Sequence, residues 1–191
     1  MADKTLTEQQ AKWMASVRAS LETSTGRTLA QWGEVARGCP ETAPRARQKW
    51  LKDNHGLGQN YAAMVLSELA RANGEAPRDP EALGAALWSA PEAAAVFAAL
   101  QAAVADLPDL VTGQRKTYAT WSRAYAFASA RPARAATVRL GLAVEPAASP
   151  RLEPAHNEVW SERLKATLVL TRPDQVDDEV RALLRAAWDR S

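Results

Sequence analysis

The sequence is poor in the residues that most metal centres, disulfides and nucleophilic active sites require. Its 191 residues include one cysteine, Cys39, and two histidines, His55 and His156. A single thiol excludes an internal disulfide framework, and this set has neither the number nor the spacing of zinc ligands. The chain also lacks a P-loop, a dinucleotide fingerprint and a serine–histidine–aspartate order. We therefore expect a non-enzymatic protein with no catalytic residue, no metal and no cofactor.

Long hydrophobic runs are absent too. The longest uninterrupted apolar run, residues 93–100, is far too short to span a membrane. The first residues contain no apolar core of a signal peptide. Hydrophobic residues make up 47% of the chain and charged residues 24%, which is typical of a soluble globular protein. These features predict a cytoplasmic protein that does not bind membranes.

Charge is distributed unevenly along the chain, although the net charge is only +2. Residues 1–73 hold ten Lys or Arg against seven Asp or Glu, and residues 111–172 hold ten against four. Between them, residues 74–110 hold one basic residue against six acidic ones. Two moderately basic blocks separated by an acidic one are compatible with a polyanionic partner such as nucleic acid.

The pattern of the first 73 residues is helical throughout. In the first expected helix, Trp13, Val17 and Leu21 recur every fourth residue, which predicts one buried stripe. Thr28 and Gln31 form a capping-box signal for a second helix. A third helix is expected from about residue 44 to 54, and a fourth contains the apolar run from 61 to 69. Residues 1–73 are therefore predicted to form an all-α domain of four helices.

A linker is expected at residues 74–80, where Asp79 has the chemistry of a helix cap and Pro80 that of a first helical residue. Beyond it, alanine-rich helices are expected at about residues 80–88 and 91–107. We predict a second domain over residues 81–191.

Periodicity changes from helical to alternating in this second domain. Residues 138–144 and 163–170 alternate apolar with polar or small side chains, as half-buried strands do. Residues 117–122 and 125–129 are two further candidate strands. The last expected helix carries one apolar stripe from Val176 to Trp188, which would cover the sheet. The predicted fold class is α+β: a four-helix domain followed by a small domain with about four antiparallel strands and flanking helices.

The turn Gly56-Leu57-Gly58 is the strongest functional candidate. With Ala62 four residues after the second glycine, it has the pattern of a helix-hairpin-helix, in which amides at the start of the second helix bind a phosphate. The alternative is purely structural: Gly56 ends one helix in a left-handed conformation and Leu57 fills the core. The candidate phosphate-binding residues are Arg45, Arg47, Lys49, Lys52, Gly56, Gly58 and Gln59.

A second candidate is an anion-binding face on the sheet. Basic residues of the second domain would converge opposite the row that contains Val138 and Leu168, and Tyr118 and Trp121 would add stacking surface. A carrier of a small anionic ligand would hold it between sheet and helices, and the alternative is a solvated basic face. The candidate residues are Lys116, Tyr118, Arg139, Arg163 and Lys165.

Seven tryptophans are many for this length. Trp13, Trp32, Trp50 and Trp188 have the spacing of helical core residues. Trp160 lies in a polar loop, where an exposed ring would mark the contact surface of a protein-interaction adaptor. We expect this ring to be buried.

Two stretches of the first domain resemble a known family. Residues 49–62, Lys-Trp-Leu-Lys-Asp-Asn-His-Gly-Leu-Gly-Gln-Asn-Tyr-Ala, resemble the signature of a small bacterial helical domain, domain of unknown function 4287. Residues 25–32, Thr-Gly-Arg-Thr-Leu-Ala-Gln-Trp, fit the same family. The resemblance implies a helical fold and no established reaction.

The second domain resembles domain of unknown function 5655. The segments concerned are residues 116–118, 125–128, 139–142 and the closing stretch 176–188. That family is distantly similar to small α+β proteins of the YdhG and YjbR kinds, which implies either iron handling or DNA binding. Because the central block is basic, we rank nucleic-acid backbone binding first, a small-anion carrier second and a protein-interaction adaptor third.

Overall fold

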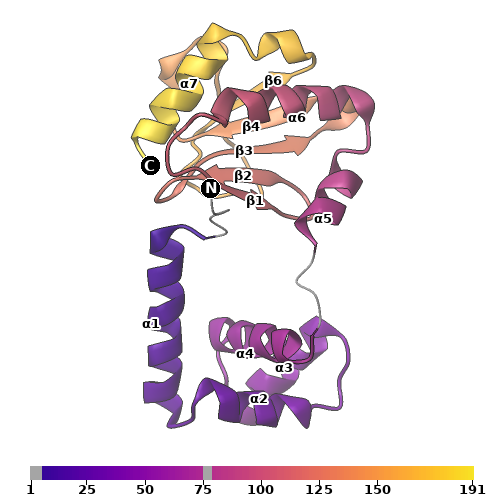
Figure 1. Ribbon diagram of the computed structural model, residues 1–191, viewed down its shortest axis with the longest axis vertical. Helices are drawn as coiled ribbons and strands as arrows, with labels where there is room; N and C mark the ends of the chain where they lie inside the picture. Colours follow the sequence, from indigo (N-terminus) through magenta and orange to yellow (C-terminus); the bar gives the residue numbers. More distant parts are fainter. Residues whose placement is uncertain (1–5, 75–78) are drawn as a thin grey trace. The chain divides into compact units, whose positions relative to one another are not determined.

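The computed structural model describes residues 6–74 and 79–191, which belong to two compact units (Figure 1). The first unit lies within residues 10–78, and the second comprises residues 79–191 together with residues 6–9. The predicted linker, residues 74–80, falls mostly outside the described residues, but its end is visible. There the side chain of Asp79 accepts a hydrogen bond from the backbone N–H of Glu81, and Pro80 begins a helix.

The first unit contains the four expected helices: α1 (Glu8–Thr25), α2 (Leu29–Arg37), α3 (Pro44–His55) and α4 (Gln59–Ala72). The capping box of α2 forms as predicted, because Gln31 N–H donates to the Thr28 hydroxyl and Thr28 N–H donates to the Gln31 side chain. The core of this unit consists of Leu21, Leu29, Trp32, Ala36, Leu51, Leu57, Ala62, Val65 and Leu69.

The predicted buried stripe of α1 is wrong for its first half. Leu21 is buried, Val17 is half-buried, and Trp13 is 56% exposed. Contacts with the rest of the unit gather near the end of α1, where Trp32 donates its indole N–H to Thr25 and Ser20 is bonded to Tyr61. The spacing identified a face of the helix correctly but not how far along it the other helices reach.

The second unit contains a six-stranded antiparallel sheet in the order β1-β2-β3-β4-β6-β5. Two helices precede it, α5 (Pro80–Leu87) and α6 (Pro91–Val104), and α7 (Asp178–Asp189) follows it. The strands are β1 (Val111–Gln114), β2 (Ala119–Ser122), β3 (Ala126–Pro132), β4 (Val138–Leu142), β5 (Glu153–Pro154) and β6 (Ala166–Leu170).

The α+β fold class is confirmed, with two more strands than the roughly four predicted. β1 has only four residues and includes Gly113, and β5 has two residues and ends in a proline. Such short edge strands carry too few residues to show an alternating pattern.

The sheet has one apolar face, on which α6 and α7 pack (Figure 1). Leu140 pairs with Leu168 across β4 and β6, and Val138 with Leu170, so these residues share that face. Strand alternation places Arg131, Arg139, Gly141 and Thr167 on the opposite face, called here the outer face.

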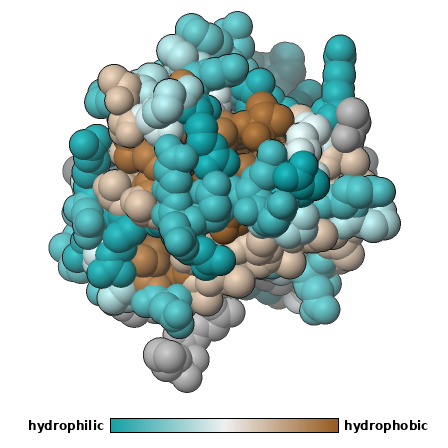
Figure 2. Space-filling model, turned by 90° about the horizontal axis from the view of Figure 1, so that it is seen from above, coloured by the Kyte–Doolittle hydropathy of each residue, from teal (hydrophilic) through white to brown (hydrophobic). Residues whose placement is uncertain are grey.

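Hydrophilic residues are prominent on the surface (Figure 2). Figure 2 shows one face of the molecule, where hydrophilic residues cover most of the area and hydrophobic ones appear in small areas between them. Within residues 6–74 and 79–191, none of the helices is long and apolar enough to cross a membrane.

Candidate functional site

The turn between α3 and α4 has the geometry of a glycine-terminated helix end. Gly56 adopts φ +67°, and its N–H donates to the Lys52 carbonyl at 2.9 Å. The Leu57 N–H donates to the Leu51 carbonyl at 3.2 Å, and the Leu57 side chain is 2% exposed. This bond pattern closes α3 and buries its hydrophobic anchor. The structural roles expected for Gly56 and Leu57 are therefore present.

The start of α4 leaves its first amides without a cap. Gly58 is the N-cap residue, with no side chain to accept a hydrogen bond, and the first turn holds no acidic residue. Backbone bonding begins where Ala62 N–H donates to the Gly58 carbonyl. The N–H groups of Gln59, Asn60 and Tyr61 therefore lie in the unpaired first turn, and Gly58, Gln59 and Asn60 are exposed.

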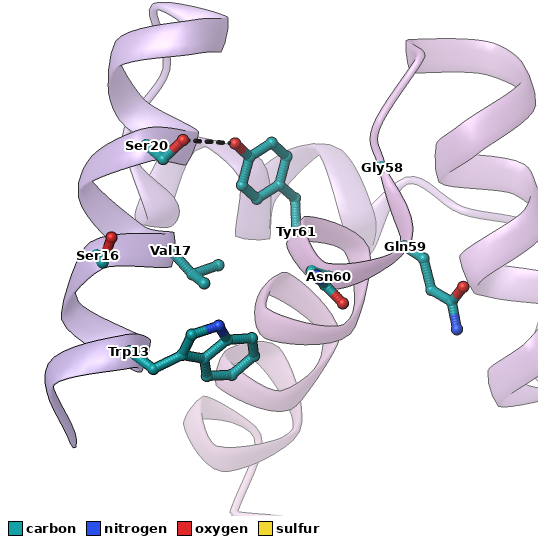
Figure 3. A pocket seen from close by; sticks show the side chains of 8 residues that line it. All are labelled: Trp13, Ser16, Val17, Ser20, Gly58, Gln59, Asn60 and Tyr61. Carbon is teal, nitrogen blue, oxygen red and sulfur yellow. Dashed lines mark hydrogen bonds between the residues drawn. The ribbon is translucent and has the colours of Figure 1, made fainter. Parts of the chain in front are cut away.

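A groove of about 450 Å³ lies beside these amides (Figure 3). Tyr61 and Ser20 join its two walls by a 2.7 Å hydrogen bond between their hydroxyls, which lowers the pKa of Tyr61 below its usual value. Trp13 and Val17 project from α1 toward α4, whereas Gln59 points away. The lining residues are Trp13, Ser16, Val17 and Ser20 from α1, with Gly58, Gln59, Asn60 and Tyr61.

The predicted basic residues of α3 divide into two groups. Arg45, Lys49 and Lys52 follow the i, i+4, i+7 spacing of one helix face and are exposed. Lys49 is paired with Asp53, whereas Arg45 and Lys52 form no ion pair within the part of the chain that the structure describes. Arg47 is half-buried and donates to the Ala36 carbonyl at 3.0 Å, so it ties α3 to α2.

The five predicted anion-binding residues of the second unit do not converge on one site. Arg139 lies on the outer face, opposite the row of Val138 and Leu168 as predicted, and therefore not between the sheet and the helices. Lys116 is exposed between β1 and β2, and Tyr118 lies beside Trp160, with ring centroids 6.4 Å apart. Trp121, expected to offer stacking surface, is buried in the core.

Arg163 and Lys165 do share a pocket, of about 200 Å³. The Arg163 guanidinium lies 3.9 Å from the centroid of the Tyr125 ring. Lys165 bonds to Glu145 at 2.6 Å, which lowers the pKa of that carboxyl group. The remaining lining residues are Ala126, Ala143, Arg190 and Ser191.

The structure adds two candidate functional residues that the sequence did not indicate, Arg131 and Glu158. Glu158, from the loop between β5 and β6, bonds to both Arg131 and Arg139, and its side chain is only 6% exposed. Neither Arg131 nor Glu158 has a local sequence signal, because the pairing depends on the strand register and the path of the loop. Trp160, in the same loop, is buried as expected, so it is not an exposed contact surface for a partner protein.

Metal ligands do not gather anywhere in the described ranges: no group of three His, Cys, Asp or Glu residues there is arranged to hold a metal ion. Cys39 is half-buried and free, and His55 packs edge-on against Trp50 with ring centroids 4.8 Å apart.

Comparison with known proteins identifies both regions of the chain. Residues 13–71 match the family model described as Domain of unknown function (DUF4287), and residues 85–191 match Domain of unknown function (DUF5655). No curated protein and no solved structure matches the chain. The chain thus carries a DUF4287 domain, and its match over residues 85–191, more than half of its length, makes it a member of the DUF5655 family.

Proposed function

We propose that this protein is a cytoplasmic, non-enzymatic binding protein that engages the phosphate backbone of nucleic acid without sequence preference. The contact surface is the start of α4 together with the exposed face of α3 that carries Arg45, Lys49 and Lys52. This surface is called the turn site below.

The observation that carries the proposal is the uncapped, exposed start of α4. Unpaired amides at a helix N-terminus and the partial positive charge of the helix dipole favour an anionic group. The helices α3 and α6 also begin without a side-chain cap, but each has a proline in its first turn. Proline removes one of the amides, whereas the first turn of α4 keeps all of them.

The cations of α3 supply the second part of the interaction. Arg45 and Lys52 have no competing carboxylate partner within the described residues, so their charge is available to an external phosphate. Neutralising backbone phosphates releases condensed counterions, and the affinity therefore falls steeply as salt rises. Contacts of this kind carry no sequence information.

Trp13 supplies a third element. This residue is 56% exposed and lines the groove beside Gly58 and Asn60. An exposed indole next to a phosphate site offers a face on which an unpaired base can stack, and stacking is tolerant of sequence. The groove therefore favours single-stranded over double-stranded nucleic acid.

Fluorescence anisotropy with a labelled single-stranded oligonucleotide over a salt series tests the proposal. For Arg45→Ala with Lys52→Ala, the slope of log affinity against log salt should flatten by about 1.4, because each lost phosphate contact contributes about 0.7 on single strands. A matched control, Arg115→Ala with Arg181→Ala, removes the same charge from exposed positions of the other unit. Absence of binding at low salt, or equal slopes for both double variants, would contradict the proposal.

A second candidate function is the binding of a small anionic ligand in the pocket that contains Arg163 and Lys165. Three cationic side chains line this pocket, the third being Arg190, against one acidic side chain, Glu145. The Tyr125 ring beneath Arg163 adds an aromatic wall.

Thermal unfolding against a panel of anionic metabolites tests this second candidate. A ligand that binds only the folded state should raise the melting temperature with concentration, and Arg163→Ala should reduce that rise. A flat profile across the panel, or a rise that survives Arg163→Ala unchanged, would rule the pocket out.

A further inference from the structure

Two arginines face each other across the outer face of the sheet. Arg131 of β3 and Arg139 of β4 are direct cross-strand partners. Like charges at directly opposed positions destabilise an antiparallel pair. Both side chains are about 70% buried, so water screens their repulsion less than it would at an open surface. This pair therefore needs an anion beside it.

That anion is supplied by the chain itself. Residues 155–165, called the strap here, connect β5 to β6 and bring Glu158 to the two guanidinium groups. Nε and Nη2 of Arg131 each lie 3.1 Å from Glu158 Oε2, and Nη1 of Arg139 lies 3.2 Å from Oε1. Arg139 Nη1 also lies 3.4 Å from the Thr167 hydroxyl. The carboxylate thus sits in a preformed clamp of guanidinium donors, and the Thr167 hydroxyl accepts a hydrogen bond from one of them, Arg139.

The strap is held on the outer face by Trp160. A Cβ atom at position 141 would lie 2.7 Å from the Trp160 ring, so Gly141 provides the space that the ring fills. The Arg131 guanidinium lies 5.7 Å from the ring centroid. The indole N–H of Trp160 is buried and has no hydrogen-bond partner in the described structure. A buried, unpaired donor costs free energy, so this indole N–H makes docking of the strap less favourable.

The charges of the clamp are not balanced. Two guanidinium groups face one carboxylate, which leaves an excess of one positive charge in a largely buried cluster. A phosphate group near neutral pH carries a charge of about −1.5 to −2, with three oxygens free to accept hydrogen bonds. It would neutralise both arginines and use the fork geometry of each.

We propose that Arg131 and Arg139 form a binding site for a phosphate group, and that Glu158 occupies this site as an internal competitor. An incoming phosphate displaces Glu158 and lifts the strap, which exposes Trp160. The site lies in the second unit, involves none of the residues of the turn site, and does not depend on the function proposed above.

Thermal unfolding of Glu158→Gln in inorganic phosphate, with sodium chloride at matched ionic strength as reference, tests the proposal. Removing the competing carboxylate should increase the apparent phosphate affinity at least tenfold over that of the unaltered protein. Adding Arg139→Gln to Glu158→Gln should abolish the gain. Equal phosphate responses of Glu158→Gln and the unaltered protein, or a gain that persists without Arg139, would overturn the proposal.

Two further measurements decide the question if Glu158→Gln does not fold. Gly141→Ala places a methyl group against the Trp160 ring and should weaken strap docking without touching either arginine, so its phosphate affinity should also rise. In the unaltered protein, phosphate should accelerate amide hydrogen exchange of residues 155–165 relative to chloride. Unchanged phosphate affinity in Gly141→Ala and unchanged strap exchange would mean that the Glu158 cluster is structural only. Oligonucleotide binding at the turn site is unaffected by either outcome.

Discussion

The helices α4 and α7 begin in opposite ways. At α7, the Asp177 side chain accepts the Val180 N–H at 3.0 Å, and Asp178 and Glu179 occupy the first turn. Arg151 then pairs with both Asp177 and Glu179. At α4, glycine stands at the cap position and no acidic residue occupies the first turn.

The difference separates a helix start that is satisfied within the chain from one that is open to a ligand. The hydrogen bond from Val180 and the pairing with Arg151 hold the pKa of Asp177 below its usual value. The acidic residues of α7 are therefore accounted for by capping and the helix dipole. The first amides of α4 have no such acceptor from a capping side chain, and an external anion would provide one.

Converting the start of α4 into one like that of α7 should have the largest effect. In Gly58→Asp, the new carboxylate accepts an amide of the first turn and repels phosphate. A charge-assisted hydrogen bond contributes about 1.5–3 kcal/mol, so oligonucleotide affinity should fall by about 100-fold once repulsion is included. Anisotropy titration at low salt measures the loss.

Gly58→Ala is the matched control for this change. The nearest side-chain atom to a Cβ at position 58 is 4.0 Å away, on Tyr61, so alanine fits without a clash and offers no competing oxygen. Its affinity should remain close to that of the unaltered protein. An equal loss in both variants would show that Gly58 matters for its size and not for the open amides.

Removing a single amide from α4 should have a smaller effect. Proline is well tolerated at the first helical position, and Gly58 already has the extended conformation that precedes proline (φ −60°, ψ 156°). Gln59→Pro should therefore keep the helix while lowering oligonucleotide affinity by about tenfold, the lower end expected for one charge-assisted hydrogen bond. Gln59→Ala retains the amide and should bind normally, and tight binding by Gln59→Pro would exclude this donor.

Gly56 ends α3, and replacing it should change the free energy of unfolding by about as much as Gln59→Pro changes the free energy of binding. A side chain at φ +67° costs about 1–2 kcal/mol, so Gly56→Ala should lower the free energy of unfolding of the first unit by that amount. Gly33→Ala within α2 is the control and should raise it by about 0.5–1 kcal/mol. Chemical denaturation measures both, and a neutral Gly56→Ala would show that the left-handed turn is not required.

Loss of the cap of α7 should have the smallest effect, and it should depend on pH. Because folding lowers the pKa of Asp177, its contribution is present above the ordinary carboxyl pKa of about 3.9 and is lost as the pH falls through the folded-state value. Asp177→Ala should lower the melting temperature by a few degrees at pH 7 and leave it unchanged near pH 2. A difference that is independent of pH would contradict this account.

The helices and the principal strands were predictable because their signals are local. Thr28 with Gln31, Asp79 with Pro80, and the alternation around Leu140 each identify an element from a few neighbouring residues. The same holds for the turn at Gly56, whose left-handed conformation and helix-ending role were expected.

Features that depend on distant contacts were not predictable. The spacing of Trp13 matches that of a core residue, but exposure depends on how far the other helices reach along α1. The pairing of Glu158 with Arg131 and Arg139 depends on the register of β3 and β4 and on the path of the strap. The role of Gly58 before α4 was also ambiguous from the sequence, because glycine is common both in structural turns and in phosphate-binding turns.

Amide chemical shifts of the ¹⁵N-labelled full chain, recorded during titration with a single-stranded oligonucleotide, test the turn site most directly. We expect the largest saturable shifts at the N–H groups of Gln59, Asn60 and Tyr61, and we expect Gly58→Asp to abolish them. Binding that leaves these three amides unperturbed while shifting others would contradict the proposal that the open start of α4 holds the phosphate.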